Sequence, residues 1–89
     1  MRGRYLEVTF RKGRPIAAYL YLPRRAGDHS TRASRTPSGL VIDYGKRGDP
    51  IGIEITVPEK VSLAALNRVL ARLEQPPLTA DELAPLMAA

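Results

Sequence analysis

The residues of this chain that could carry catalytic chemistry are few and scattered. His29 is the only histidine, and it lies between Asp28 and Ser30. A catalytic triad needs such groups to converge in space around an oriented nucleophile, and adjacency in sequence does not supply that arrangement. The favoured interpretation is therefore a solvated loop histidine, and no catalytic residue is predicted here.

A pair of carboxylates is the second candidate. Asp43 and Glu54 fall on the same outer face of two strand-like segments. Paired carboxylates can exchange protons or hold a divalent cation, or they can keep an exposed face polar. With one histidine and no cysteine, the chain lacks the ligands of a usual structural zinc site. The sequence predicts no metal and no cofactor, and it predicts that the protein is not an enzyme.

A glycine-basic loop is the third candidate. Gly45-Lys46-Arg47-Gly48 has the composition of a phosphate-binding loop, but it joins two strand-like segments. A phosphate-cradling loop needs a longer Gly-Lys-Ser/Thr pattern and a helix directly after it. The loop is therefore predicted to be a hairpin turn.

Tyrosines and arginines of the first half form the fourth candidate. On a sheet, aromatic side chains flanked by arginine can stack on bases and hold phosphates. Tyrosine is also a good strand former and a common contact residue, so the same cluster predicts a protein interface. The sequence leaves both alternatives open. The predicted surface comprises Arg4, Tyr5, Tyr19, Tyr21, Arg24, Arg25, Arg32 and Arg35.

The charge of the chain is unevenly distributed. The net charge is +5, with nine basic and two acidic residues in 1–38, and five basic and seven acidic residues in 39–89. The first part is thus net +7 and the second net −2. A positive half of this kind can meet nucleic acid or an acidic protein.

The length and composition set the remaining bounds. The 89 residues fit one small domain with a modest core, and a second copy is a common source of stability at this size. We therefore expect a homodimer. No apolar run reaches the roughly 18 residues of a membrane span, and the basic N-terminus alternates too early for a signal peptide. The sequence predicts a soluble cytoplasmic protein without a membrane partner.

Alternation of apolar residues predicts two β-hairpins. The first joins strands over 4–11 and 16–22, with Leu6, Val8, Phe10 and Ile16 facing inward. The second spans 39–57, and its predicted register pairs Leu40 with Ile55, Ile42 with Ile53, and Tyr44 with Ile51. A shift of one residue would turn the whole apolar set outward, so this register is well specified.

The rest of the chain is predicted to be a mobile loop and a helical segment. Residues 23–38 lack large apolar side chains and read as a loop, with a short edge strand over 31–35 as an alternative. Ser62 is the predicted N-cap of a helix that continues to Glu74. Thr79 and Glu82 form a capping-box pattern for a second, short helix that Pro85 limits.

Three segments resemble a known family. AAYLYL (17–22), GLVIDY (39–44) and IGIEI (51–55) are similar to the strands of the bacterial domain of unknown function 2283 family. The resemblance covers 16–57, and the basic turn RKGRP (11–15) departs from the acidic turn usual in that family. It implies a small β-meander with a C-terminal helix. Because some relatives are encoded beside small toxin-like proteins, it also implies an antitoxin-type role.

The sequence as a whole predicts one α+β domain over 1–89. Its fold is an antiparallel β-meander of four to five strands over 1–57, covered on one face by a C-terminal helical segment over 58–89. The predicted function is a non-enzymatic protein-interaction module that forms a homodimer. The alternative is a basic nucleic-acid-binding domain that uses the outer tyrosine and arginine face.

Overall fold

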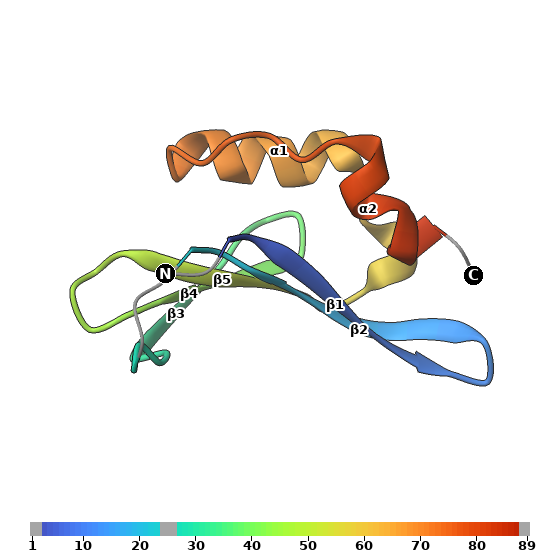
Figure 1. Cartoon of the computed structure of the whole chain (residues 1–89), viewed down its shortest axis with the longest axis horizontal. Helices are drawn as coiled ribbons and strands as arrows, with labels where there is room; N and C mark the ends of the chain where they lie inside the picture. Colours follow the sequence, from blue (N-terminus) through green and yellow to red (C-terminus); the bar gives the residue numbers. More distant parts are fainter. Residues whose placement is uncertain (1–2, 24–26, 88–89) are drawn as a thin grey trace.

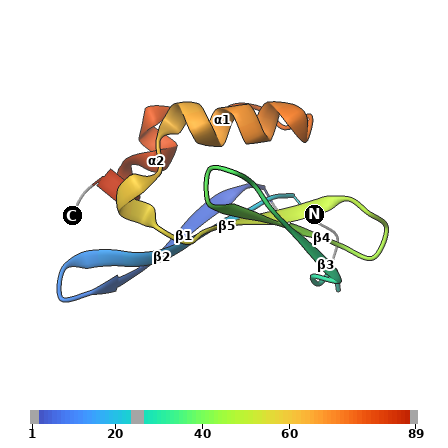
Figure 2. The ribbon, with the colours of Figure 1, turned by 180° about the vertical axis from the view of Figure 1, so that it is seen from behind.

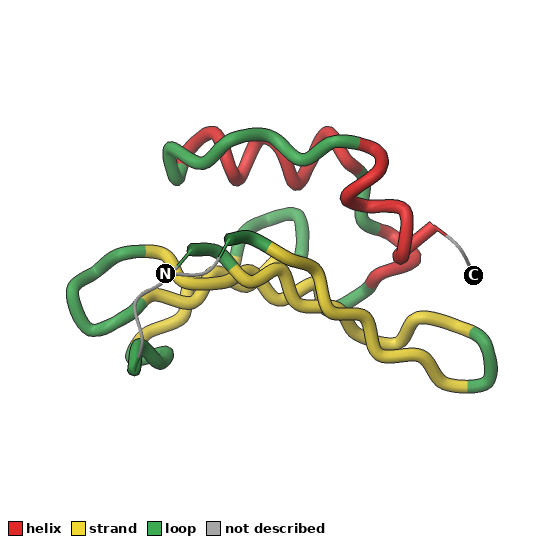
Figure 3. The backbone as a smooth tube through the Cα atoms, viewed as in Figure 1, coloured by secondary structure: helices red, strands yellow, loops and turns green. Residues whose placement is uncertain are grey.

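The structure is a computed structural model, and it describes residues 3–23 and 27–87. Five strands form one antiparallel sheet, and the helices lie on one of its faces (Figures 1 and 3). The predicted α+β class with a covering C-terminal helix is therefore confirmed. The elements are β1 (Tyr5–Arg11), β2 (Arg14–Tyr21), β3 (Arg32–Arg35), β4 (Leu40–Tyr44), β5 (Pro50–Ile55), the 3-10 helix η1 (Pro58–Lys60), α1 (Leu63–Arg72) and α2 (Ala80–Met87).

The strand order corrects one part of the prediction. The order is β1-β2-β5-β4-β3, so β2 pairs with β5 and the sheet is not a simple meander. The physical reason lies in the strand sequences. All four residues of β3 are exposed, whereas Ile51, Ile53 and Ile55 of β5 are each at most 2% exposed. The most apolar strand takes the centre, where it is paired on both sides, and the polar strand takes an edge, where it resists edge-to-edge association.

The β4–β5 hairpin has the predicted register except at its end. Leu40 lies opposite Ile55 and Ile42 opposite Ile53, as predicted. Tyr44 pairs with Pro50 instead of Ile51, because the register shifts between Asp43 and Tyr44. Such a shift lets the strand bend into its turn.

The β1–β2 hairpin also departs from the prediction near its turn. The pairs Tyr5–Tyr21 and Glu7–Tyr19 form as predicted, but the register shifts between Thr9 and Phe10. Beyond this shift, Phe10 is 46% exposed and Ile16 is 49% exposed, although both were predicted to face inward. The turn end of this hairpin extends past α1 and α2, beyond the part of the sheet over which these helices lie (Figures 1 and 2).

One apolar layer between sheet and helices forms the core. From the sheet it takes alternate residues of β2, β4 and β5, and from the helices it takes the inner stripe of α1 and the apolar residues of α2. Partly buried Leu6, Val8 and Tyr44 pack against it. The buried residues of this cluster are Ala18, Leu20, Leu22, Leu40, Ile42, Ile53, Ile55, Leu66, Val69, Leu70, Leu78, Leu83 and Leu86.

The ends of both helices follow the predicted capping signals. The Ser62 side chain accepts a hydrogen bond of 3.1 Å from the backbone N–H of Ala65, which confirms it as the N-cap of α1. The Thr79 hydroxyl accepts from the N–H of Glu82 at 3.2 Å, and the Glu82 carboxylate accepts from the N–H of Thr79 at 3.0 Å. These reciprocal bonds are the predicted capping box, and they position the start of α2.

Asn67 fixes the connection between the two helices, a role that sequence analysis did not assign. Its side-chain oxygen accepts from the N–H of Leu78 at 2.7 Å, and its side-chain nitrogen donates to the carbonyl of Leu78 at 3.2 Å. The segment after α1 therefore runs back along that helix, and α2 begins near the edge of the sheet (Figure 1). The only signal in the sequence is an amide side chain in a helix whose other polar residues are arginines.

Candidate functional site

The three predicted tyrosines come together on the sheet face that points away from α1 and α2. Tyr5 and Tyr21 stack with ring centroids 4.4 Å apart and planes 13° apart. Tyr19 meets Tyr21 edge to face, with centroids 4.7 Å apart and planes at 67°. Both arrangements are favourable for aromatic pairs. The structure thus contains the predicted tyrosine cluster, which we call the outer tyrosine cluster.

The outer face is organised as two cross-strand rows, because residues paired in register point to the same side. One row runs along Tyr5, Tyr21, Gly52, Asp43 and Ala33. The next row runs along Glu7, Tyr19, Glu54, Val41 and Arg35. The tyrosines therefore occupy the β1–β2 side, and two of the three carboxylates lie further across the sheet.

Tyr19 crosses the central strand to reach Asp43. Its hydroxyl donates a hydrogen bond of 2.8 Å to the Asp43 carboxylate on β4. The ring lies over Gly52 of β5, where an added Cβ would fall 2.0 Å from the hydroxyl oxygen and 2.2 Å from Cζ. Only glycine leaves room for this ring, so Gly52 is needed at this position for close approach.

A second tyrosine also binds a carboxylate. The Tyr21 hydroxyl donates to Glu7 Oε1 at 3.2 Å. The rows thus hold three carboxylates, Glu7, Asp43 and Glu54, and among their described members one cation, Arg35. The described residues of these two rows therefore carry a net negative charge, which repels phosphate groups.

The predicted arginines that the structure describes, Arg4, Arg32 and Arg35, do not gather around the tyrosines. Arg35 belongs to the second row, on β3, at the opposite side from β1. Arg32 pairs with Tyr44 across β3 and β4, and its guanidinium lies 4.1 Å from the centroid of that ring, a cation–π contact. Because Tyr44 packs against the core, Arg32 lies on the helix-covered side. Arg24 and Arg25 lie outside the described residues.

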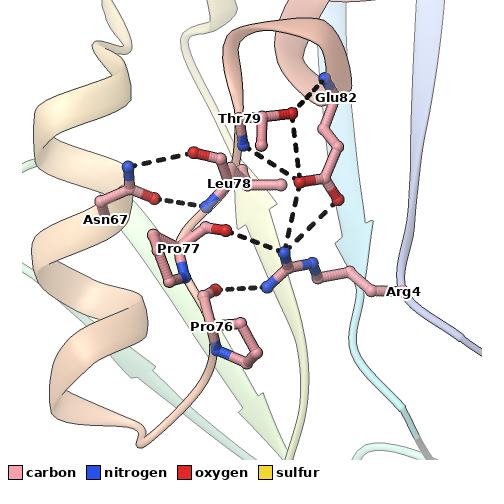
Figure 4. A network of polar contacts seen from close by, with 7 residues as sticks. All are labelled: Arg4, Asn67, Pro76, Pro77, Leu78, Thr79 and Glu82. Carbon is pink, nitrogen blue, oxygen red and sulfur yellow. Dashed lines mark hydrogen bonds and ion pairs between the residues drawn. The ribbon is translucent and has the colours of Figure 1, made fainter.

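Arg4 is turned toward the helices (Figure 4). Its guanidinium donates to the carbonyls of Pro76 and Pro77, the latter at 3.0 Å, and forms an ion pair of 3.4 Å with Glu82. The Arg4 side chain is 13% exposed. This residue therefore joins the start of β1 to the segment between α1 and α2, and it is a structural contact of the chain with itself.

His29 and the glycine-basic loop are the other candidates from the sequence, and both lie in loops. His29 is exposed, and its Nδ1 lies 3.3 Å from the carbonyl oxygen of Gly27. The loop after β4 is a closed turn, in which the N–H of Gly45 donates to Asp49 at 2.8 Å and the N–H of Gly48 donates to Gly45 at 2.9 Å. Within residues 3–23 and 27–87, no group of three His, Cys, Asp or Glu side chains is arranged to hold a metal.

Comparisons with known proteins yield no match to a family model, to a curated protein or to a solved structure. The resemblance to the domain of unknown function 2283 family therefore stays a prediction. None of the helices described here has the length and apolar character needed to span a membrane. The assignment of a function consequently depends on the geometry of the outer face.

The contact between Tyr19 and Gly52 can be tested by a pair of substitutions. Gly52→Ala is expected to displace the ring, because the new methyl group would overlap it. Tyr19→Phe should lower the free energy of unfolding by about 0.5–1.5 kcal/mol in the parent chain, the value of a typical hydrogen bond. In the Gly52→Ala background the same change should cost almost nothing. Urea unfolding of the four proteins measures this coupling.

A matched control is available at Gly3. An added Cβ at Gly3 meets nothing within 4 Å, so Gly3→Ala should leave the cost of Tyr19→Phe unchanged. An equal cost of Tyr19→Phe with and without Gly52→Ala would contradict the crossing of the ring over β5.

The Arg4–Glu82 contact predicts a pH dependence of stability. The backbone N–H of Thr79, and then the charge of Arg4, outweigh partial desolvation and hold the pKa of Glu82 below its ordinary value of 4.5. Because the folded state has the lower pKa, this stabilisation is present above the unfolded-state pKa and is lost as the pH falls through the folded-state pKa. Glu82→Gln should therefore lower the melting temperature at pH 7, with a difference from the parent chain that shrinks as the pH falls below about 4.

Thermal unfolding followed by circular dichroism at pH 7, 4 and 3 measures this difference. Glu59→Gln is the matched control, since it makes the same change at an exposed residue of η1. A destabilisation by Glu82→Gln that stays constant across the three pH values would rule out a role for the ionised carboxylate.

Proposed function

We propose that this protein is a non-enzymatic protein-interaction module that forms a homodimer through its outer sheet face. The observation that carries the proposal is the outer tyrosine cluster, on a face that no described helix covers (Figure 2). Tyrosine is enriched in protein interfaces, because it offers a large apolar ring with a polar tip. Tyr5, at the sheet edge, is 50% exposed and is the most accessible large hydrophobic side chain among those whose exposure the structure describes.

The cluster is already ordered before any partner binds. Tyr21 is held by stacking on Tyr5 and by its bond to Glu7, and Tyr19 is held over Gly52 by its bond to Asp43. Ordering side chains on association costs free energy, and rings that are fixed in advance lose less freedom. This preorganisation favours binding by a relatively small surface.

The charges of the second row favour a second copy as the partner. Glu7 is at the β1 end of the row and Arg35 is at the β3 end. Consider two copies that pack outer face to outer face about a two-fold axis parallel to the strands. The strand order of one copy then runs opposite to that of the other, so β1 of each copy lies over β3 of its partner. Glu7 of each copy then lies over Arg35 of the other, so opposite charges meet twice.

The same arrangement limits the affinity of the dimer. If the axis follows the central strand, Glu54 of one copy approaches Glu54 of the other, which is unfavourable for two exposed carboxylates. A five-stranded face with strands about 4.8 Å apart is roughly 20 Å wide, which corresponds to an interface at the small end of the usual range. We therefore expect dissociation at micromolar concentrations.

The carboxylates of this face also bear on whether a protein or a nucleic acid binds there. Glu7, Asp43 and Glu54 would each approach phosphate groups if bases stacked on the tyrosines. Arg4, which was predicted to bind those phosphates, is engaged with Pro77 and Glu82. A protein partner fits the outer face better than a nucleic acid does.

Truncation of the most exposed tyrosine is the first test. Tyr5→Ala is expected to weaken dimerisation about tenfold, because an interface tyrosine contributes more than 1 kcal/mol when it is a major contact. Sedimentation velocity between 1 and 200 µM measures the dissociation constant. Val57→Ala is the control, since Val57 is 49% exposed and belongs to neither row. A parent chain that stays monomeric over this range would refute the homodimer.

A charge exchange is the second test, and it addresses the orientation of the two copies. Glu7→Arg alone and Arg35→Glu alone should each weaken the dimer, since each places like charges together. The double variant should regain most of the lost affinity, because both cross-copy pairs are restored with reversed sign. If the double variant dimerises as weakly as the sum of the single changes predicts, the two-fold arrangement is wrong even though a dimer exists.

A further inference from the structure

The end of the β1–β2 hairpin is a separate feature that the outer face does not explain. We call residues 10–16, which lie beyond the register shift between Thr9 and Phe10, the hairpin arm. The arm extends past α2 and is seen in profile at one end of the molecule in both ribbon views (Figures 1 and 2). Its base is braced, because β2 contacts η1, and the buried residues Pro15 and Pro58 line the same hollow.

The tip of the arm concentrates positive charge. Arg11, Lys12 and Arg14 are all exposed, and among the described residues none of the three forms an ion pair. The hollow between the tip and η1 has one acidic residue, Glu59, in its lining. Three cations within four positions therefore face solvent with little neutralisation, and they form a compact site for polyanions.

The backbone of the turn adds a second observation. Lys12 has φ of 52° and Gly13 has φ of 78°, so both central residues are in the left-handed region. A two-residue hairpin turn of this kind favours Asn-Gly, because asparagine tolerates a positive φ better than lysine does. Lysine at this position is less favourable in conformational energy than asparagine, but it places a positive charge at the extreme tip of the arm. Backbone strain of this kind is typically retained at functional sites.

Apolar side chains lie on the flanks of the arm. Phe10 and Ile16 are 46% and 49% exposed, and they are two of the four large apolar residues that the described chain exposes. They are set back from the tip, where the cations are. A loop that inserts into a membrane needs its apolar residues at the leading end, whereas here the cations lead and the apolar residues follow. This order favours an anionic groove, in which the cations meet phosphates and the apolar residues make contacts behind them.

We propose that the hairpin arm binds double-stranded DNA by entering its major groove. The major groove of B-form DNA is about 12 Å wide and 8.5 Å deep, and it admits a two-stranded β-ribbon. Three residues at about 3.4 Å each give the arm a reach of roughly 10 Å beyond the register shift. The long side chains of Arg11, Lys12 and Arg14 contact phosphates on the groove walls, while Phe10 and Ile16, set back from the tip, meet sugars at the rim of the groove. The major groove of A-form RNA is too narrow for side chains to read, so duplex RNA is a poorer ligand.

This proposal does not rest on the proposed dimer, and fluorescence anisotropy tests it. The probe is a labelled 20-base-pair DNA duplex, titrated with protein at several salt concentrations. The logarithm of the binding constant falls linearly with the logarithm of the salt concentration, and each phosphate contact adds about 0.9 to the magnitude of this slope. Replacement of all three cations, R11Q/K12Q/R14Q, should therefore reduce the slope by about 2.7 and lower the affinity at low salt at least tenfold. Phe10→Ser should lower the affinity without changing the slope.

The matched control removes three exposed cations elsewhere. K46Q/R47Q/K60Q makes the same change in net charge but leaves the arm intact, and it should retain most of the slope. Circular dichroism spectra and melting temperatures verify that each variant is folded. Equal loss in both triple variants would overturn the proposal, because binding would then follow net charge alone.

Two further probes separate the other ligands. A 20-base-pair RNA duplex that binds as tightly as the DNA overturns entry into the major groove. Binding to vesicles containing phosphatidylserine, with no binding to the DNA duplex, overturns the proposal in favour of a membrane surface. Absence of DNA binding by the parent chain at 50 mM salt overturns it as well.

Discussion

Strand β5 is the constraint on which both faces of this protein depend. On one face, its isoleucines form the middle of the core beneath the helices, and Ile53 is fully buried. On the other face, Gly52 leaves the space that the Tyr19 ring occupies on its way to Asp43. A strand with bulky residues on both faces would keep the core but lose the ordered tyrosine cluster. The alternation of isoleucine with a glycine thus serves packing on one side and surface organisation on the other.

The contacts of Arg4 connect this sheet to the C-terminal helical segment. They join the start of β1 to the α1–α2 connection and to the capping box of α2, while Asn67 holds the same connection from α1. This use of Arg4 also affects the charge of the outer face. Because Arg4 is held on the helix side, its guanidinium does not neutralise Glu7 and Asp43 on the outer rows, which supports the proposed protein partner.

The two proposed binding features lie on one hairpin. The outer tyrosine cluster is at the end of the β1–β2 pair where the chain begins, and the cationic arm is at its turn. The register shift between Thr9 and Phe10 separates them. Because a bulge bends a strand and increases its local twist, the arm can extend past the helical layer while the rest of the hairpin stays flat against it. A dimer that joins outer faces would therefore leave two arms free.

By itself, the sequence determined the elements whose signals are local. Alternation gave the strands and most of the β4–β5 register, and capping residues such as Ser62 and Thr79 gave the helix starts, because these patterns act between near neighbours in the chain. The tyrosine pairs across β1 and β2 follow from the same alternation. The tertiary structure alone decided that β2 pairs with β5, that Arg4 binds the α1–α2 connection and Arg32 the ring of Tyr44, and that Phe10 and Ile16 are exposed. Each of these depends on a contact between distant segments or on where the helical layer ends, and no local pattern encodes either.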